Sequence, residues 1–341
     1  MKINLKKITK PFIIAELSAN HNGKIENIFK LIDQAKKCGA NAIKIQSYTP
    51  QSMTLDCKNK HFYINEGPWK DSYLYDLYQK GTTPYSWHKE IFSYAKKKDI
   101  LCFSTPFDIE SLKLLEKLKT PLYKIASFEI NHIPLLEAVG RTKKPVIIST
   151  GMADTKDIDL AVKTLKKNGS KDIAILHCIS SYPSKPHNYN LNFINILKKY
   201  NFPVGLSDHT IGNIVAISSV GFGVKIFEKH IKLDGQKGLD SNFSTNLNEF
   251  KDYVNSINLS FSAMGTENFD RQKLEGPSKK HRRSIFVSKD VKKNDIITEK
   301  NIAVVRPSNG LHPKYYFKIL GKKINKDISA GTPLKKIFIK D

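Results

Sequence analysis

The chain of 341 residues carries 56 Lys and Arg against 32 Asp and Glu, a formal net charge of +24. The basic residues are spread along the whole chain rather than clustered as on a phosphate-binding surface, so nucleic-acid binding is the weaker interpretation of this charge. No stretch reaches the roughly 20 apolar residues of a membrane span, and Glu16 interrupts the first apolar run, so we expect neither a membrane anchor nor a signal peptide.

The four cysteines, at positions 38, 57, 102 and 178, show no paired spacing. Two of them lie in or just after apolar runs, where cysteine behaves as a small hydrophobic residue. We therefore expect a reducing, cytoplasmic location. A basic surface of this kind would attract phosphorylated or carboxylated small substrates.

Eight apolar runs rich in β-branched residues each end abruptly in polar or charged side chains, and a helix-patterned stretch leads from one run to the next. The runs occupy residues 12–15, 42–43, 100–103, 122–123, 146–148, 173–176, 204–206 and 224–227. A strand buried on both faces has no reason to carry an unpaired charge unless its carboxyl end opens onto a site. The pattern predicts an α/β fold, a (β/α)8 TIM barrel, with its chemistry at the carboxyl ends of the strands.

The second run is followed by a long excursion, residues 48–83, that is rich in aromatic residues. An insertion on the catalytic face of a barrel usually covers the substrate. A surface loop packed on its own aromatic side chains is an equally good interpretation, and the sequence leaves both open.

The chain is too long for a barrel alone, which needs roughly 250 residues, so a second domain is expected. We assign residues 1–265 to the barrel and residues 266–283, with Gly, Pro and a basic cluster, to a linker. Residues 284–341 are predicted to form a small β-rich domain. Its strands are expected at 284–287, 295–298 and 302–306. A domain of this size is marginally stable alone, so we expect it to dock on another surface.

Two histidines end neighbouring strands of the predicted barrel, His209 in the segment 205–210 and His230 in the segment 228–230. Strands seven and eight are adjacent, so both imidazoles can reach one point above the centre of the barrel. Two neutral imidazoles, with water or substrate oxygens in the remaining positions, suit a catalytic divalent ion such as Mn2+. A single histidine at a strand end is more often a hydrogen-bonded core residue, but the matched pair favours the metal.

Three lysines, Lys44, Lys124 and Lys229, also lie at strand ends. Buried lysines need partners, and three that converge indicate a multiply charged anion such as a phosphate with a carboxylate. Hydroxyl donors stand at the same level, namely Thr105, Ser127, Ser149 and Ser207. The alternative is a Schiff-base aldolase with one nucleophilic lysine, although the two histidines favour anion and metal over an imine.

Two carboxylates, Glu16 and Glu129, follow predicted strands. Each is explained as the ion-pair partner of a lysine, or as a group that moves a proton near a metal-bound water or an aldehyde. The spacing of the residues leaves both interpretations open.

Six strings, in this order along the chain, resemble the sialic acid synthase family, enzymes that condense phosphoenolpyruvate with an amino sugar to give nine-carbon 2-keto sugar acids. The strings occupy residues 14–23, 103–108, 124–127, 148–152, 205–210 and 228–230. The tail, from residue 305 through residue 321, resembles the antifreeze-like (SAF) domain that ends these enzymes. The resemblance therefore covers essentially the whole chain.

Within the family, further strings are most similar to the pseudaminic acid synthases, namely residues 18–22, 53–56, 74–78, 83–88, 127–129 and 306–314. The resemblance implies that the acceptor is 2,4-diacetamido-2,4,6-trideoxy-L-altropyranose and that the product serves surface glycans such as those of flagellin. An N-acetylneuraminate or legionaminate synthase is the alternative within the family. A non-catalytic sugar-binding or nucleic-acid-binding protein is the alternative of a different class.

The resemblance also implies roles for individual residues. His209 and His230 would hold the divalent metal, usually Mn2+ or Mg2+. Glu129 would handle the proton of the attacking water, and Glu16 would contact the sugar near its aldehyde. Phosphoenolpyruvate would be bound by Lys44, Thr105, Lys124, Ser127, Ser149 and Ser207. Further active-site positions, whose roles are less defined, are Gln46, Phe107, Tyr182 and Asp240.

In the family a tail arginine reaches the active site of the partner subunit, and the corresponding residue is Arg306. The resemblance therefore implies a domain-swapped homodimer. The chain departs from the family pattern at 238–240, where Gly-Leu-Asp replaces the common Gly-Pro-Asp, and at Ser180, a position that is often Asn. Both lie where the acyl groups of the sugar would be recognised, so the departures concern the identity of the sugar more than the reaction.

Overall fold

The computed structural model describes residues 3–266 and 273–340. The chain divides into two compact units, Met1–Gly265 and Thr266–Asp341, and each is described by itself. No helix in this described part of the chain has the length and apolar character that a membrane crossing requires.

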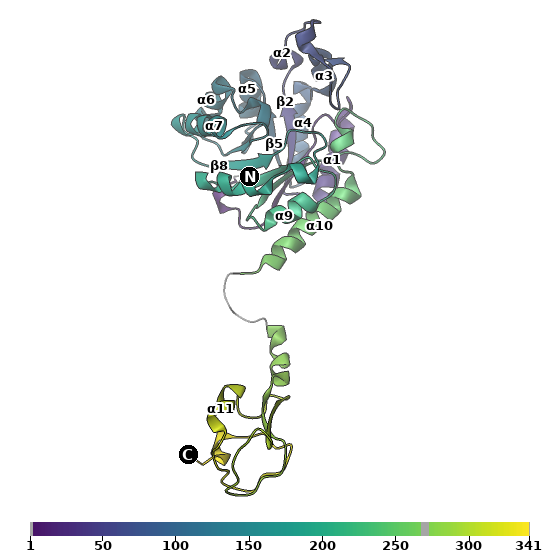
Figure 1. Cartoon of the computed structure of the whole chain (residues 1–341). Helices are drawn as coiled ribbons and strands as arrows, with labels where there is room; N and C mark the ends of the chain where they lie inside the picture. The colour runs from purple at the N-terminus through teal and green to yellow at the C-terminus, as the bar shows by residue number, and fades with distance from the viewer. Residues whose placement is uncertain (1–2, 267–272, 341) are drawn as a thin grey trace. The chain divides into compact units, whose positions relative to one another are not determined.

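Eight parallel strands close into a barrel in the first unit, in the order β1-β10-β9-β8-β7-β6-β5-β2. Figure 1 labels β2, β5 and β8 among them. The strands are β1 (Phe12–Glu16), β2 (Ala42–Ser47), β5 (Leu101–Pro106), β6 (Tyr123–Ile125), β7 (Val146–Ser149), β8 (Ile173–Cys178), β9 (Val204–Asp208) and β10 (Ile226–His230). Each overlaps one of the eight predicted runs. The predicted fold class is therefore confirmed.

Successive residues of each strand point to opposite faces, which produces two apolar layers. Side chains such as Ile14, Phe103 and Ile226 fill the inside of the barrel. Their neighbours in sequence, such as Ile13 and Phe227, pack outward against the helices. The polar side chains inside the barrel lie toward the carboxyl ends of the strands. The apolar layer therefore closes the amino-terminal end of the barrel, and the carboxyl-terminal end stays open.

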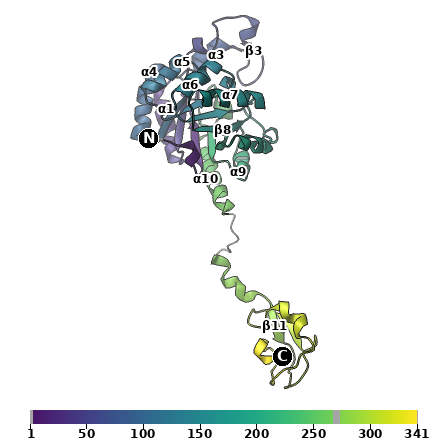
Figure 2. The same cartoon turned by 90° about the vertical axis from the view of Figure 1, so that its left-hand side faces the viewer.

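Helices cover the outside of the barrel, and consecutive ones such as α6 and α7 or α9 and α10 contact one another (Figure 2). The helices are α1 (Ile25–Lys37), α4 (Tyr85–Lys97), α5 (Ile109–Lys117), α6 (Ile133–Arg141), α7 (Thr155–Lys167), α8 (Ile194–Leu197), α9 (Ile214–Val220) and α10 (Leu247–Met264). Three of them begin with a capping box, in which Asp108, Asp154 or Asn246 accepts a hydrogen bond from the N–H three residues on.

The aromatic excursion between β2 and α4 folds into short elements. They are α2 (Pro50–Met53), a 3-10 turn (Lys60–Phe62), a two-stranded ribbon of β3 (Tyr63–Ile64) and β4 (Ser72–Tyr73), and α3 (Leu74–Gly81). Two further 3-10 turns, η3 (Ser127–Glu129) and η7 (Ser241–Phe243), follow β6 and β10. All of these segments follow the carboxyl ends of strands.

The second unit is built on an antiparallel pair, β11 (Ser284–Val287) and β12 (Ile302–Val305), with a short helix α11 (Tyr316–Ile319). The strand predicted at 295–298 is reduced to a single bridge, between Ile296 and Lys323. Its backbone does bond to the segment 321–324, since Ile297 donates to the carbonyl of Lys322 and accepts from the N–H of Gly321, and Asp295 accepts from the N–H of Ile324. Side-chain turns lie at both ends of the stretch and keep it short: Asp295 accepts from the N–H of Lys292, and Asn301 from the N–H of Thr298. Part of the predicted linker, 267–272, lies outside the described residues.

Candidate active site

A pocket of about 390 Å3 opens at the carboxyl ends of the barrel strands. Its floor consists of inward-facing side chains from the carboxyl-terminal parts of β2, β6, β7, β8, β9 and β10, and part of its wall comes from the excursion. A polar floor under a largely apolar wall is the usual construction of a small-molecule site.

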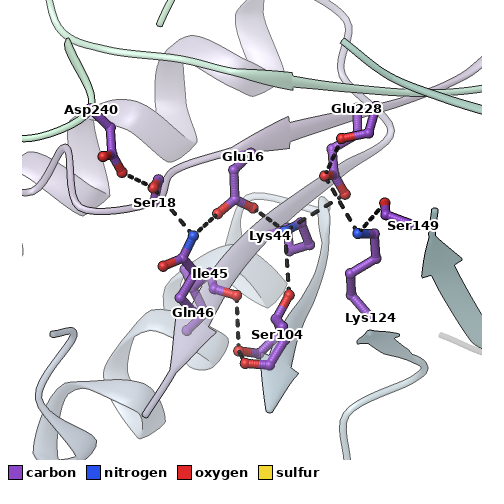
Figure 3. A network of polar contacts seen from close by, with 12 residues as sticks. Glu16, Ser18, Lys44, Ile45, Gln46, Ser104, Lys124, Ser149, Glu228 and Asp240 are labelled. Carbon is purple, nitrogen blue, oxygen red and sulfur yellow. Dashed lines mark hydrogen bonds and ion pairs between the residues drawn. The ribbon is translucent and has the colours of Figure 1, made fainter. Parts of the chain in front are cut away.

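A chain of buried charges crosses this floor (Figure 3). The Nζ atom of Lys44 lies 2.7 Å from Oε2 of Glu16 and 3.6 Å from Oε2 of Glu228. The other oxygen of Glu228 lies 3.7 Å from Nζ of Lys124, which donates a 2.6 Å hydrogen bond to the hydroxyl of Ser149. Glu228 therefore lies between two ammonium groups, and all four charged side chains are buried.

Burial and pairing act against each other on these groups. Burial would lower the pKa of Lys44, but Glu16 and Glu228 outweigh it and hold this pKa above its ordinary value. Burial also lowers the pKa of Lys124, and Glu228 compensates only in part while Lys44 adds repulsion. Burial would raise the pKa of Glu228, but Lys124 and Lys44 outweigh it and keep the carboxylate ionised. Lys124 is thus the ammonium group that an additional anion would stabilise most.

The carboxylate of Glu16 begins a second chain of hydrogen bonds toward the wall. Burial raises the pKa of Glu16, and Lys44 opposes this only in part. Gln46 donates to Oε1 of Glu16 at 3.1 Å and to the hydroxyl of Ser18 at 3.3 Å. Ser18 in turn donates to Asp240. A substrate hydroxyl or aldehyde above Glu16 would therefore meet groups whose orientation is already fixed.

Glu129 lies in η3, beside the floor of the pocket. Burial raises the pKa of its carboxyl to about 7, and Lys124 opposes this shift only in part. One of its oxygens, Oε2, is buried without a hydrogen-bond partner. A carboxyl that titrates near neutral pH can take and return a proton.

The rings of His209 and His230 meet at the other side of the floor, with 5.4 Å between their centroids. Nδ1 of His209 donates to the carbonyl of Ile179 at 2.8 Å, which places the ring proton on Nδ1 and leaves the lone pair on Nε2. Nδ1 of His230 is buried without a partner. Burial, with His209 and the lysines adding to it, holds the pKa of His230 well below its ordinary value, so this imidazole is neutral.

This donor set fits a divalent ion bound by two imidazoles. The described residues contain no cluster of three or more His, Cys, Asp or Glu side chains that would complete a metal site. Water or substrate oxygens would therefore fill the remaining positions, as in catalytic sites that keep open coordination.

Comparison with known proteins places this geometry in a family. Residues 31–269 match the NeuB family, and residues 282–337 match the SAF domain. The chain belongs to the NeuB family. The resemblance to sialic acid synthases and the SAF type of the tail are thereby confirmed.

Relatives of this NeuB-family chain extend over nearly its full length. It is 43% identical over 334 residues to a pseudaminic acid synthase from Campylobacter jejuni, with 97% of each chain covered. It is 42% identical to a pseudaminic acid synthase from Helicobacter pylori, covering 95% of this chain and 96% of the relative. The crystal structure of N-acetylneuraminic acid synthetase from Leptospira borgpetersenii, in complex with citrate, matches with a TM-score of 0.72 and 32% identity, covering 82% of this chain and 95% of that one.

Most residues that the sequence singles out in this NeuB-family chain converge on the pocket. Those that line it are Lys44, Gln46, Phe107, Lys124, Ser127, Glu129, Ser149, Tyr182, Ser207, His209, His230 and Asp240. Glu16 and Thr105 lie behind Lys44, whose Nζ donates to the hydroxyl of Thr105 at 3.3 Å. Arg306 belongs to the second unit, where its side chain is exposed, and its role at a partner subunit stays a prediction.

The expectation that Lys229 joins the other two lysines is wrong. Side chains alternate along β10, so Glu228 and His230 point into the barrel and Lys229 points out between β10 and the helices. Its Nζ lies 3.2 Å from Asp208, with both side chains fully buried, and 5.1 Å from the centre of the Tyr253 ring. Lys229 is therefore a structural residue of the barrel wall.

Sequence reasoning assigned no role to Glu228, although it holds both pocket lysines. The same alternation would have found it, because a residue two positions before an inward-facing His230 must also face inward. For the excursion, residues 48–83, the sequence allows either a cover over the substrate or a surface loop packed on itself. The structure shows that it lines the pocket. It contributes Met53, Ile64, Trp69, Leu74, Leu77 and Tyr78 to the wall.

Proposed function

We propose that this chain is a pseudaminic acid synthase, a transferase that condenses phosphoenolpyruvate with 2,4-diacetamido-2,4,6-trideoxy-L-altropyranose and water to give pseudaminic acid and phosphate. One observation carries the proposal: the buried ammonium groups of Lys44 and Lys124 share a pocket floor with the two imidazoles of His209 and His230, which could hold a metal. The relatives named above support the choice of sugar.

Phosphoenolpyruvate would bind at the lysine side of the floor. Its phosphate and carboxylate together carry more negative charge than Glu228 alone offers to Lys44 and Lys124. The hydroxyls of Ser127, Ser149 and Ser207 line the same floor and would donate to the remaining oxygens. Ammonium groups held in a low-dielectric pocket stabilise charge that develops in the transition state, an effect often worth about 3 kcal/mol.

His209 and His230 would hold a divalent metal, Mn2+ or Mg2+, which supplies Lewis-acid polarisation of the open-chain aldehyde of the sugar. The C3 carbon of phosphoenolpyruvate would attack this aldehyde, whose oxygen takes up a proton and becomes a hydroxyl, and water would add at C2. Glu129, with its pKa raised to about 7 by burial, would take the proton from that water. The tetrahedral intermediate loses phosphate by cleavage of its C–O bond, which leaves the 2-keto acid.

The apolar wall would hold the far end of the sugar. The indole N–H of Trp69 already donates to the carbonyl of Leu239 at 3.1 Å, and Asp240 already accepts from Ser18. Unpaired sugar hydroxyls would lose hydrogen bonds to water against such a wall, whereas methyl groups would gain by burial. A 6-deoxy sugar with two acetamido groups suits the wall better than a sugar rich in hydroxyls.

The finer assembly is part of the same proposal. Arg306 would reach the active site of a partner subunit, in a domain-swapped homodimer. The reaction would take place in the cytoplasm, where the four free cysteines stay reduced.

The position of an isotope label tests the reaction type. Phosphoenolpyruvate labelled with 18O in the bridge between C2 and phosphorus is incubated with the enzyme, Mn2+ and the sugar, and phosphate is followed by 31P NMR. The proposal predicts that the released phosphate carries the label and forms only when the sugar is present. Label that remains in the sugar acid would contradict C–O cleavage.

A further inference from the structure

The backbone and the ring of His209 are held by three different partners. Its N–H donates to the hydroxyl of Tyr189 at 2.9 Å, and its carbonyl accepts from the N–H of Ser184 at 2.9 Å. Its ring Nδ1 donates to the carbonyl of Ile179 at 2.8 Å. All three partners belong to the segment that follows β8, so this segment fixes the place of His209.

Tyr189 is the one side chain among these partners. It is 1% exposed, and its hydroxyl also donates to the carbonyl of Ser207 at 2.9 Å. One oxygen therefore bridges two backbone groups, on the residues to either side of Asp208. The pairing of β8 with β9 ends at Cys178 and Ser207, so the hydroxyl continues the hydrogen bonding of β9 beyond the end of the ladder.

The ring of Tyr189 cannot move freely, because β8 holds it in turn. Nε2 of His177 donates to the carbonyl of Tyr189 at 2.5 Å, and the two rings meet edge to face at 5.7 Å. A hydroxyl on a fixed ring transmits that fixed position to the backbone of His209.

The opposite side of the same backbone is held by the buried pair of Asp208 and Lys229. Oδ1 of Asp208 accepts from the N–H of Thr210 at 2.9 Å, and Oδ2 lies 3.2 Å from Nζ of Lys229. The residues before and after His209 are thus fixed from the helix side, and Tyr189 fixes His209 itself. The backbone of His209 therefore cannot shift unless one of these bonds breaks, and the ring cannot rotate without breaking its bond to the carbonyl of Ile179.

We propose that Tyr189 is a positioning residue for the divalent metal: its hydroxyl holds the backbone of His209 so that this imidazole keeps its place 5.4 Å from that of His230. The inference rests on the proposed function for the presence of the metal. It adds a residue that touches neither substrate nor metal and acts on a ligand through the backbone. Outer partners of metal ligands commonly change metal affinity by about tenfold or more.

The test is the affinity for Mn2+, measured by electron paramagnetic resonance titration on the purified full chain. Tyr189→Phe removes one oxygen and leaves the N–H of His209 buried without a partner. We expect Mn2+ to bind about tenfold more weakly, since an unsatisfied buried donor is costly. His209→Ala, which removes the ligand, should abolish binding.

Tyr123→Phe is the matched control. Tyr123 is 0% exposed, and its hydroxyl donates to Glu116 away from the pocket. Tyr123→Phe should lower the melting temperature by no more than Tyr189→Phe does, because Glu116 is partly exposed and keeps its ion pair with Lys144. Only Tyr189→Phe should change the affinity for Mn2+. If Tyr189→Phe does not fold, His177→Asn releases the same ring from β8 and should weaken Mn2+ binding in the same direction.

Unchanged Mn2+ affinity in folded Tyr189→Phe, or an equal loss in Tyr123→Phe, would overturn the inference and leave the proposed function standing. A wild-type chain that binds no Mn2+ would also overturn it, because no metal would need positioning. The proposed function is decided separately, by turnover of phosphoenolpyruvate with the sugar.

Discussion

The ammonium group of Lys44 lies 2.7 Å from the carboxylate of Glu16, and the two residues are direct register partners on β2 and β1. The register of the two strands therefore brings these side chains together. Both side chains are buried. Removing one partner of such a pair leaves a buried charge without compensation and typically costs about 3–5 kcal/mol.

Glu16→Gln should for this reason destabilise the fold and weaken catalysis together. Glu228 still faces Lys44 at 3.6 Å and compensates part of its charge, so we expect a loss of about 2 kcal/mol in the free energy of unfolding, less than the usual cost of a broken buried pair. Urea unfolding measures it. Glu110→Gln, which breaks the exposed pair with Lys113, is the control and should change stability by less than about 0.5 kcal/mol. Equal effects of the two substitutions would contradict the account.

The pKa of Glu129 predicts a pH dependence of both stability and rate. Burial raises this pKa from 4.5 to about 7, so the folded chain binds a proton more tightly than the unfolded chain does. The resulting stabilisation is complete below pH 4.5 and is lost as the pH rises through 7. It amounts to at most about 3 kcal/mol.

Glu129→Gln should remove this fall in stability between pH 4.5 and 7, as followed by urea unfolding. In the wild type, kcat/KM should rise with pH around a midpoint near 7, because the ionised carboxylate is the base. In the variant kcat/KM should be low and without that midpoint. A midpoint that persists in Glu129→Gln would assign the titration to another group.

His230→Ala should abolish metal-dependent turnover and leave the fold intact. The side chain faces the pocket, and its Nδ1 has no hydrogen-bond partner to lose. Treatment of the wild type with a chelator should have the same effect and be reversed by Mn2+. Circular dichroism and calorimetric Mn2+ titration check both points, and full activity of folded His230→Ala would refute the metal assignment.

Leu77→Asn should reduce the preference for a 6-deoxy sugar. Leu77 lies in α3, on the pocket wall that the excursion provides. The ratio of kcat/KM for the diacetamido sugar over N-acetylmannosamine should fall about tenfold, the usual value of one small apolar group in a pocket. Leu77→Met, which conserves volume, should keep the ratio. An unchanged ratio in Leu77→Asn would show that the wall does not select the sugar.

The barrel and most of the floor were predictable because they depend on local patterns. Apolar runs that end in charges predict buried parallel strands with a site at their carboxyl ends, and β1 and β10 follow this pattern. Lys229 was misplaced because strand-end position was considered without alternation along the strand. Counting from His230 in steps of two separates Glu228, which faces inward, from Lys229, which does not.

The wall and the tail depended on contacts that the sequence does not contain. The hydrogen bond from Trp69 to Leu239 joins residues 170 positions apart in the sequence, so no local sequence pattern predicts it. In the tail, turns formed by the side chains of Asp295 and Asn301 shorten the strand that alternation at 295–298 suggested to a single bridge. The contact between Tyr189 and His209 is not predictable for a similar reason, because Tyr189 lies in a loop that carries no recognisable motif.

The choice of sugar tests the central claim most directly. The purified chain is incubated with Mn2+ and phosphoenolpyruvate and, in parallel, with 2,4-diacetamido-2,4,6-trideoxy-L-altropyranose, N-acetylmannosamine or the legionaminate precursor, and phosphate release and product mass are measured together. The account predicts phosphate and the mass of pseudaminic acid with the altrose sugar alone. Turnover with one of the other sugars instead would assign the chain a different acceptor sugar and keep the reaction. No turnover with any of the three in folded, metal-loaded protein would contradict the proposed function.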